Sequence, residues 1–179
     1  GIYIFNADYL IRELERDHAD TTSSHDFGKD IIPHAVRHGQ AAAHPFALSC
    51  VSDGKGEHYW RDVGTIDAYW EANMDLTATD PHLNLYDRNW PIWSYQEQLP
   101  PAKFVHNAGD RCGMAIESLV SGGCIVSGSA FRSVLFSVVR IHSYAKVNWS
   151  VLMPRVNVGR GARLTRVVVD SGCNIPAGM

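Results

Sequence analysis

The sequence predicts an α/β layer followed by a parallel β-helix, with a proline-rich connector between the two. In residues 1–78, short apolar runs rich in β-forming residues alternate with segments of helical spacing, which is typical of an α/β layer. From about Phe104 onward, aliphatic residues recur every five or six positions, and neither a helix nor a simple alternating strand has that rhythm.

The α/β part is expected to alternate strands and helices along the chain. Asn6 can cap the first helix, Pro33 can sit in the first turn of the second, and Gly39 can end it. The predicted order is a strand at 1–5, a helix after Asn6, a helix around 30–38, strands at 40–51 and 58–63, and a helix at 65–76. The last helix repeats apolar side chains with helical spacing.

The connector, residues 79–103, loses this periodicity and holds four prolines. Its tryptophans and its Ile92 and Tyr95 need cover, so we expect it to pack rather than to act as a floppy tether.

The third segment, residues 104–179, is predicted to be a β-helix of hexapeptide-like repeats, in which each short strand sends one aliphatic side chain inward. Small residues such as Gly161 suit the tight corners between strands. The residues expected to point inward are Phe136, Ile141, Val147, Met153, Val158, Leu164, Val169 and Ile175.

Bulk properties exclude several classes of function. A net charge of −3 gives no general attraction to nucleic acid or to an anionic membrane, and no apolar run approaches the ~20 residues of a spanning helix. Four scattered cysteines favour reduced thiols in a cytoplasmic protein. The chain starts without Met, inside a predicted strand, so we expect it to be an internal piece of a longer protein.

The stretch "YWRDVGT" (59–65) places a carboxylate, Asp62, between residues that favour burial and a predicted helix. Three roles are open to it: a cap for that helix, a partner for Arg61, or a metal ligand at the end of a strand.

Several stretches together resemble the bacterial glucose-1-phosphate adenylyltransferase family (ADP-glucose pyrophosphorylases), in its C-terminal portion. They include "SSHDFGKDIIP", "YWRDVGTIDAYWEANMDL", "LYDRNWPI", "PPAKFV" and "SLVSGGCIVSGS", and the resemblance covers essentially the whole chain. It implies the end of a Rossmann-like nucleotidyltransferase domain, a left-handed β-helix, and usually a homotetramer under allosteric control. It also implies the reaction of ATP with glucose 1-phosphate, which gives ADP-glucose and pyrophosphate for glycogen synthesis.

The resemblance also implies roles for single residues. Asp62 matches a metal-binding aspartate and is expected to hold Mg²⁺ against nucleotide phosphates. Gly1 is a candidate substrate contact, or merely the start of a strand. Ser121 and Gly122 are candidate contacts for anionic metabolite effectors, because backbone amides in a glycine turn can hold an anion. Arg155, in a basic stretch with Arg160, Arg163 and Arg166, is a further effector candidate, and a solvated face is the alternative.

Other readings remain. The resemblance places a Gly-rich phosphate loop, the family's first metal-binding aspartate and its catalytic lysine region outside these 179 residues, so we expect the isolated chain to be inactive. A noncatalytic regulatory or oligomerisation subunit is one alternative. A hexapeptide acyltransferase built around His142 is a weaker one. His34 and His38, one helical turn apart, lack the further ligands that zinc needs, and are expected to be solvated.

Overall fold

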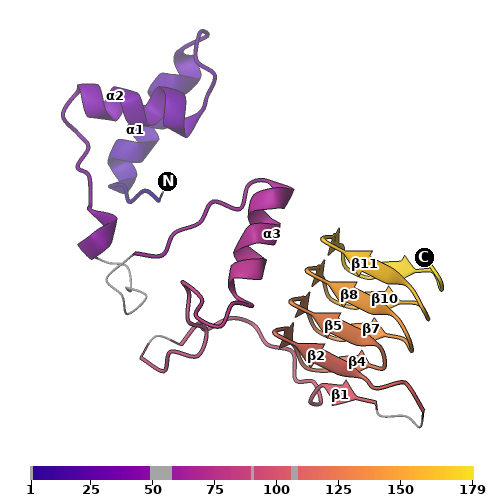
Figure 1. The fold of residues 1–179 in the computed structure, drawn as a ribbon. Helices are drawn as coiled ribbons and strands as arrows, with labels where there is room; N and C mark the ends of the chain where they lie inside the picture. The colour runs from indigo at the N-terminus through magenta and orange to yellow at the C-terminus, as the bar shows by residue number, and fades with distance from the viewer. Residues whose placement is uncertain (1, 49–57, 90, 106–108) are drawn as a thin grey trace. The chain divides into compact units, whose positions relative to one another are not determined.

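The computed structural model describes residues 2–48, 58–89, 91–105 and 109–179. The chain divides into two compact units, Gly1–Ser49 and Cys50–Met179 (Figure 1).

The first unit consists of short helices around a small buried centre. Helix α1 (Ala7–Ala19) starts where the side chain of Asn6 accepts a hydrogen bond from the Tyr9 amide at 3.1 Å, as the sequence predicts. A π-helical turn, η1 (Phe27–Ile31), continues into α2 (Ile32–Arg37), and η2 (Phe46–Leu48) is one turn of 3-10 helix. Ile31 and Ala35 are its most buried apolar residues.

Where the structure describes them, the strands predicted at 1–5, 40–51 and 58–63 are not strands; Gly1 and residues 49–51 lie outside the described residues. Residues 2–5, 40–48 and 59–63 form no β-ladder, and His58 makes only an isolated bridge. A strand is stable only when a neighbour takes up its backbone hydrogen bonds, and the described residues supply no neighbour here. Ile2 and Ile4 are accordingly 93% and 98% exposed.

The described residues of the second unit include one helix ahead of the β-helix. Helix α3 (Ile66–Asp75) confirms the helix predicted at 65–76. The described residues of the connector that follows form no helix or strand before β1, and its Trp93 and Tyr95 are each 90% exposed, while Trp90 lies outside the described residues. The expectation that the connector buries its aromatic residues is therefore wrong for these two side chains, because no described element lies over them.

The β-helix has three parallel sheets, and each coil contributes one strand to each sheet (Figure 1). The first sheet holds β1 (Lys103–Phe104), β4 (Ile125–Val126), β7 (Arg140–Ile141), β10 (Asn157–Val158) and β13 (Asn174–Ile175). The second sheet holds β2 (Met114–Ile116), β5 (Ser129–Phe131), β8 (Lys146–Asn148) and β11 (Arg163–Thr165). The third sheet holds β3 (Leu119–Val120), β6 (Val134–Leu135), β9 (Val151–Leu152) and β12 (Val168–Val169).

The core is a column of in-register aliphatic side chains. In the second sheet the side chains stacked from coil to coil are Ala115, Ala130, Val147 and Leu164. The first two are 15 residues apart in the sequence, and each later pair is 17 residues apart. In the third sheet the stacked inward residues are Leu135 and Leu152, both fully buried, and not the predicted Phe136 and Met153, which are only partly buried. The even five-and-six spacing misplaces them because both residues of each third-sheet strand are apolar.

The corner between the second and third sheets uses no glycine. Its left-handed positions are Glu117, Arg132, Trp149 and Arg166, with φ between 44° and 54°. Glycines with left-handed φ do occur at the other two corners, for example Gly123 and Gly161, whereas Gly122, Gly128 and Gly159, which were also expected to serve corners, do not have left-handed φ.

Candidate metal-binding segment beside the β-helix

Asp62 lies on an exposed segment just before α3. Its Oδ1 accepts a hydrogen bond from the Gly64 amide at 3.0 Å, which closes a local turn. A Cβ at position 64 would lie 3.2 Å from that same oxygen, so a side chain there would displace the carboxylate. Glycine at 64 therefore lets Asp62 hold this orientation.

The two structural roles open to Asp62 are taken by other residues. Thr65 caps α3, because its Oγ1 accepts a hydrogen bond from the Ala68 amide at 3.1 Å. Arg61 pairs with Asp75, with 3.8 Å between Nη2 and Oδ2. The helix cap and the partner of Arg61 are thus both accounted for without the Asp62 carboxylate.

Tyr59, at the upstream end of the segment, is partly buried and feels the charge of Asp75 at the C-terminal end of α3. Burial, and then the negative charge of Asp75, raise the pKa of Tyr59, while Arg61 acts in the opposite direction. Since Arg61 contacts Asp75 and Thr65 begins the helix, residues 61–65 run alongside α3.

Besides its contacts with residues 61–65, helix α3 packs on the outer face of the third sheet. The Trp70 indole donates a hydrogen bond from Nε1 to the Trp149 carbonyl at 2.7 Å. Met74 is buried against Val134 and Val151, with Tyr69 and Phe136 at the margin of the same cluster. One short helix therefore connects the segment that carries Asp62 to the β-helix.

The residues present fit a magnesium ion that is held mainly by a substrate. Mg²⁺ commonly takes one or two carboxylates and fills its remaining positions with phosphate oxygens and water. Asp62 offers one exposed carboxylate, with Oδ1 partly engaged by Gly64. In the part of the chain that the structure describes, no three His, Cys, Asp or Glu side chains are grouped for a metal.

The predicted effector residues share one corner of the β-helix, between the third and first sheets. Ser121 and Gly122 lie two coils away from Arg155, which is exposed. One of the two amides expected to hold an anion is used, because Ser121 N donates to Leu135 O at 2.9 Å; the neighbouring Gly123 N, which was not a candidate, donates to Pro100 O at 2.7 Å. Leu99 also lies close against Gly122. An anion at this corner would therefore depend on side chains such as Arg155, and the assignment stays a prediction.

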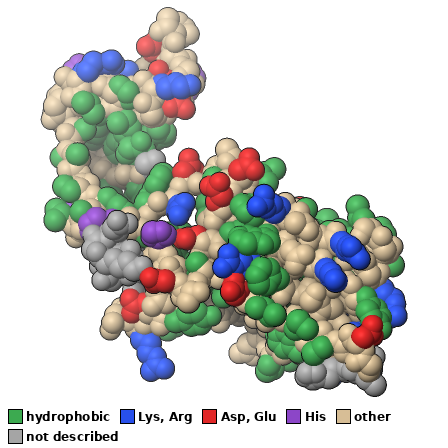
Figure 2. All heavy atoms as spheres, in the orientation of Figure 1, with side chains coloured by type: hydrophobic (Ala, Val, Ile, Leu, Met, Phe, Trp, Pro, Cys, Tyr) green, Lys and Arg blue, Asp and Glu red, His purple; other side chains and the backbone are tan. Residues whose placement is uncertain are grey.

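The other arginines of the basic stretch do not form one cluster with Arg155. Arg160 lies over the Tyr144 ring, 4.7 Å from its centroid, while Arg163 is on β11 and Arg166 at the next corner. On the face shown in Figure 2, Lys and Arg side chains are dispersed among acidic and apolar ones. Gly1, the remaining site candidate, lies outside the described residues.

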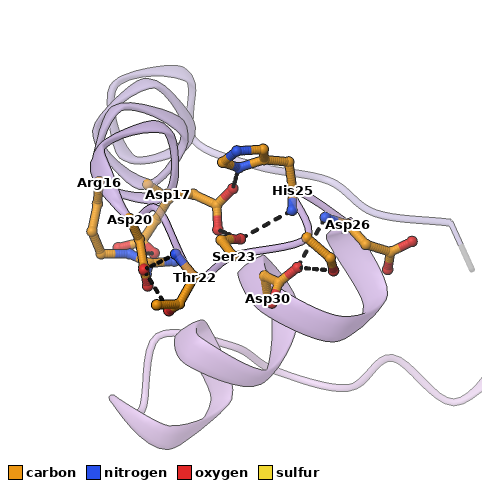
Figure 3. A network of polar contacts seen from close by, with 10 residues as sticks. Arg16, Asp17, Asp20, Thr22, Ser23, His25, Asp26 and Asp30 are labelled. Atoms are coloured by element: carbon orange, nitrogen blue, oxygen red, sulfur yellow. Dashed lines mark hydrogen bonds and ion pairs between the residues drawn. The ribbon is translucent and has the colours of Figure 1, made fainter.

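A polar network in the first unit was not predicted from the sequence. Asp17 is buried, accepts a hydrogen bond from Ser23 Oγ at 2.7 Å and contacts His25 Nδ1 at 2.8 Å (Figure 3). These two contacts, His25 first, hold the pKa of the Asp17 carboxyl below its ordinary value. The run of turn-forming residues in "DHADTTSSHD" is the signal that could have indicated such a network.

Histidines singled out from the sequence have protein partners. His34 Nδ1 lies 2.9 Å from Glu13 Oε2, and the His34 and His38 rings are 4.1 Å apart, so the expectation that both are solvated is wrong for His34. His142 Nε2 contacts Asn157 Oδ1 at 2.9 Å on the β-helix.

Comparison with known protein families gives two matches, one in each half of the chain. The Nucleotidyl transferase family matches residues 1–79, and the GlmU-like C-terminal hexapeptide family matches residues 100–179. The chain therefore joins a nucleotidyltransferase portion to a hexapeptide β-helix.

The particular resemblance is to glucose-1-phosphate adenylyltransferases. The chain, over its whole length, is 61% identical to the enzyme of that name from Albidiferax ferrireducens, 59% to that from Nitrosospira multiformis and 60% to that from Methylobacillus flagellatus. It spans less than half of those relatives, 43%, 42% and 42% of their lengths respectively. The resemblance recognised in the sequence is confirmed.

Among the described residues, no helix is both long enough and apolar enough to cross a membrane.

Proposed function

We propose that the chain is part of an enzyme that makes ADP-glucose and pyrophosphate from ATP and glucose 1-phosphate. The observation that carries this proposal is the identity of about 60% to glucose-1-phosphate adenylyltransferases along the whole chain. Asp62 adds physical support, because its exposed carboxylate is left over once the helix cap and the Arg61 ion pair are assigned to Thr65 and Asp75.

In this reaction an oxygen of the sugar phosphate displaces pyrophosphate from the α-phosphorus of ATP. Positioning and neutralisation of phosphate charge dominate the catalysis of such transfers. Asp62 would hold Mg²⁺ with the nucleotide phosphates, and the ion, when bound, neutralises charge that develops on the phosphate oxygens. The Gly64 amide orients the carboxylate, and Arg61 ties the segment to α3.

We also propose how this enzyme is regulated and assembled. Anionic metabolites would bind near Ser121, Gly122 and Arg155, and the enzyme would act as a homotetramer, as the resemblance implies. Glycogen synthesis would be the use of its product.

The test is Asp62→Asn in the full-length protein that contains this chain. We expect kcat to fall by orders of magnitude, on the order of 100-fold or more, with an unchanged circular dichroism spectrum, because the side chain is exposed and caps nothing. Asp67→Asn is the matched control, since Asp67 is an equally exposed carboxylate five residues further along, in the first turn of α3. Near-normal kcat of Asp62→Asn at saturating Mg²⁺ would refute the metal role. Absence of ADP-glucose formation by the unmodified protein would favour a noncatalytic subunit.

A further inference from the structure

Helix α3 lies between the Asp62 segment and the β-helix, and it has fixed contacts with both. On the segment side, Thr65 caps its first turn and Arg61 contacts Asp75 at its last residue. Residues 61–65 are thus joined to the helix by a hydrogen-bonded cap at Thr65, and at Arg61 by an ion pair of 3.8 Å that is too long for a hydrogen bond. A shift of α3 would therefore move the Asp62 carboxylate with it.

On the β-helix side, the most specific contact is the hydrogen bond from Trp70 to the Trp149 carbonyl. That carbonyl is held firmly. Trp149 has φ of 51°, donates its own amide to Phe131 O at 2.9 Å, and has the Arg132 guanidinium 4.8 Å from its ring centroid. The indole therefore bonds to a rigid corner between the second and third sheets.

Apolar packing is a second contact that holds α3 on the β-helix. Met74, one turn after Trp70, is buried on Val134 and Val151 of the third sheet. Val151 is completely buried, although it is not part of the inner column, because α3 covers it from outside.

We propose that Trp70 is a positioning residue for Asp62, and that the outer face of the third sheet sets the geometry of the metal-binding carboxylate through α3. This inference rests on the proposed function. Trp70 itself touches neither the metal nor the substrate in this scheme. Its indole N–H holds α3 at one height along the β-helix, and the cap and the Arg61–Asp75 pair transmit that position to the carboxylate.

Trp70→Phe in the full-length protein tests the indole hydrogen bond, because phenylalanine keeps an aromatic ring and removes the N–H. We expect the Mg²⁺ concentration for half-maximal activity to rise about three- to tenfold, the range that one lost hydrogen bond can transmit. The value of kcat at saturating Mg²⁺ should stay within about twofold. Amide exchange of residues 64–68 should accelerate, which is a readout independent of activity. Trp93→Phe is the control, since Trp93 is 90% exposed.

Val151→Ala tests the packing without touching Trp70. Its control is Val156→Ala, which deletes the same two methyl groups from an equally buried position in the inner core, away from α3. We expect only Val151→Ala to raise the Mg²⁺ requirement and the amide exchange of residues 64–68.

The outcomes separate the two hypotheses. If Asp62→Asn abolishes activity and Trp70→Phe and Val151→Ala leave Mg²⁺ dependence and exchange unchanged, the positioning role is refuted and the proposed function stands. If Asp62→Asn is fully active, the proposed metal role fails first. If Trp70→Phe and Val151→Ala do not fold while Val156→Ala does, the contact is purely structural and the inference is also overturned.

Discussion

Ser133 is the residue whose loss tests the corner architecture of the β-helix most directly. It is fully buried between the second and third sheets, where its Oγ donates to Phe131 O at 2.8 Å and accepts from the Ser150 amide at 3.1 Å. In Ser133→Ala the Phe131 carbonyl keeps a partner, because it also accepts from the Trp149 amide. The Ser150 amide loses its partner in a fully buried residue.

An orphaned buried amide costs roughly 1–3 kcal/mol, so we expect Ser133→Ala to lower the free energy of unfolding by about 2 kcal/mol. With a urea m value of roughly 2 kcal/mol per molar, the unfolding midpoint should fall by about 1 M. The assay is urea unfolding of the chain followed by circular dichroism.

Ser150→Ala is the matched control. Ser150 occupies the equivalent corner of the next coil, and its Oγ accepts a hydrogen bond from the Val167 amide at a longer 3.3 Å. Unlike Ser150 itself, Val167 is only partly buried. Water can replace the lost acceptor there, so the midpoint should fall by clearly less. The reasoning would be refuted if Ser133→Ala lowered the free energy of unfolding no more than Ser150→Ala does, or by less than about 0.5 kcal/mol. The buried Ser150 amide would then not depend on Ser133 for its stability contribution.

Two further predictions concern the carboxylates. Gly64→Ala should raise the Mg²⁺ requirement of the full-length protein several-fold, since the new Cβ would lie 3.2 Å from Asp62 Oδ1; an unchanged Mg²⁺ titration would contradict this. Asp17→Asn should lower the thermal stability of the chain near neutral pH and flatten its acid dependence. The folded-state pKa of Asp17 is lowered, so its contribution is complete above the ordinary carboxyl pKa of about 4 and is lost as the pH falls through the lowered value. Melting curves from pH 7 downward measure this, and parallel curves for the two proteins would count against it.

The repeat architecture could be predicted from the sequence because each coil places aliphatic residues at equivalent inward positions. Val158, Leu164 and Val169 recur at six- and five-residue spacing, and all three are buried in the column. The corners were harder to predict. Arg132 and Trp149 adopt left-handed φ, which normally favours glycine, because packing and hydrogen bonds with adjacent coils offset the local cost.

The surroundings of Asp62 could be predicted only in part. The sequence identifies the carboxylate and its possible partners, but it gives no reason to pair Arg61 with Asp75 rather than with its immediate neighbour. That pairing depends on residues 61–65 running alongside α3, which is a tertiary feature. The strands predicted at 1–5 and 58–63 fail for a related reason, since β-structure depends on partners that a local pattern does not contain.

The docking of α3 did leave a signal in the sequence, in the third sheet rather than in the helix. A strand whose outer face meets water alternates apolar and polar residues, as Arg140–Ile141 and Asn157–Val158 do in the first sheet. The third-sheet strands Val134–Leu135 and Val151–Leu152 are apolar at both positions, and both positions are buried. Two neighbouring buried residues in one strand face opposite sides, so this sheet must be covered from outside as well as from within. The doubly apolar strands, taken together with their burial, therefore identify the face of this β-helix on which α3 packs.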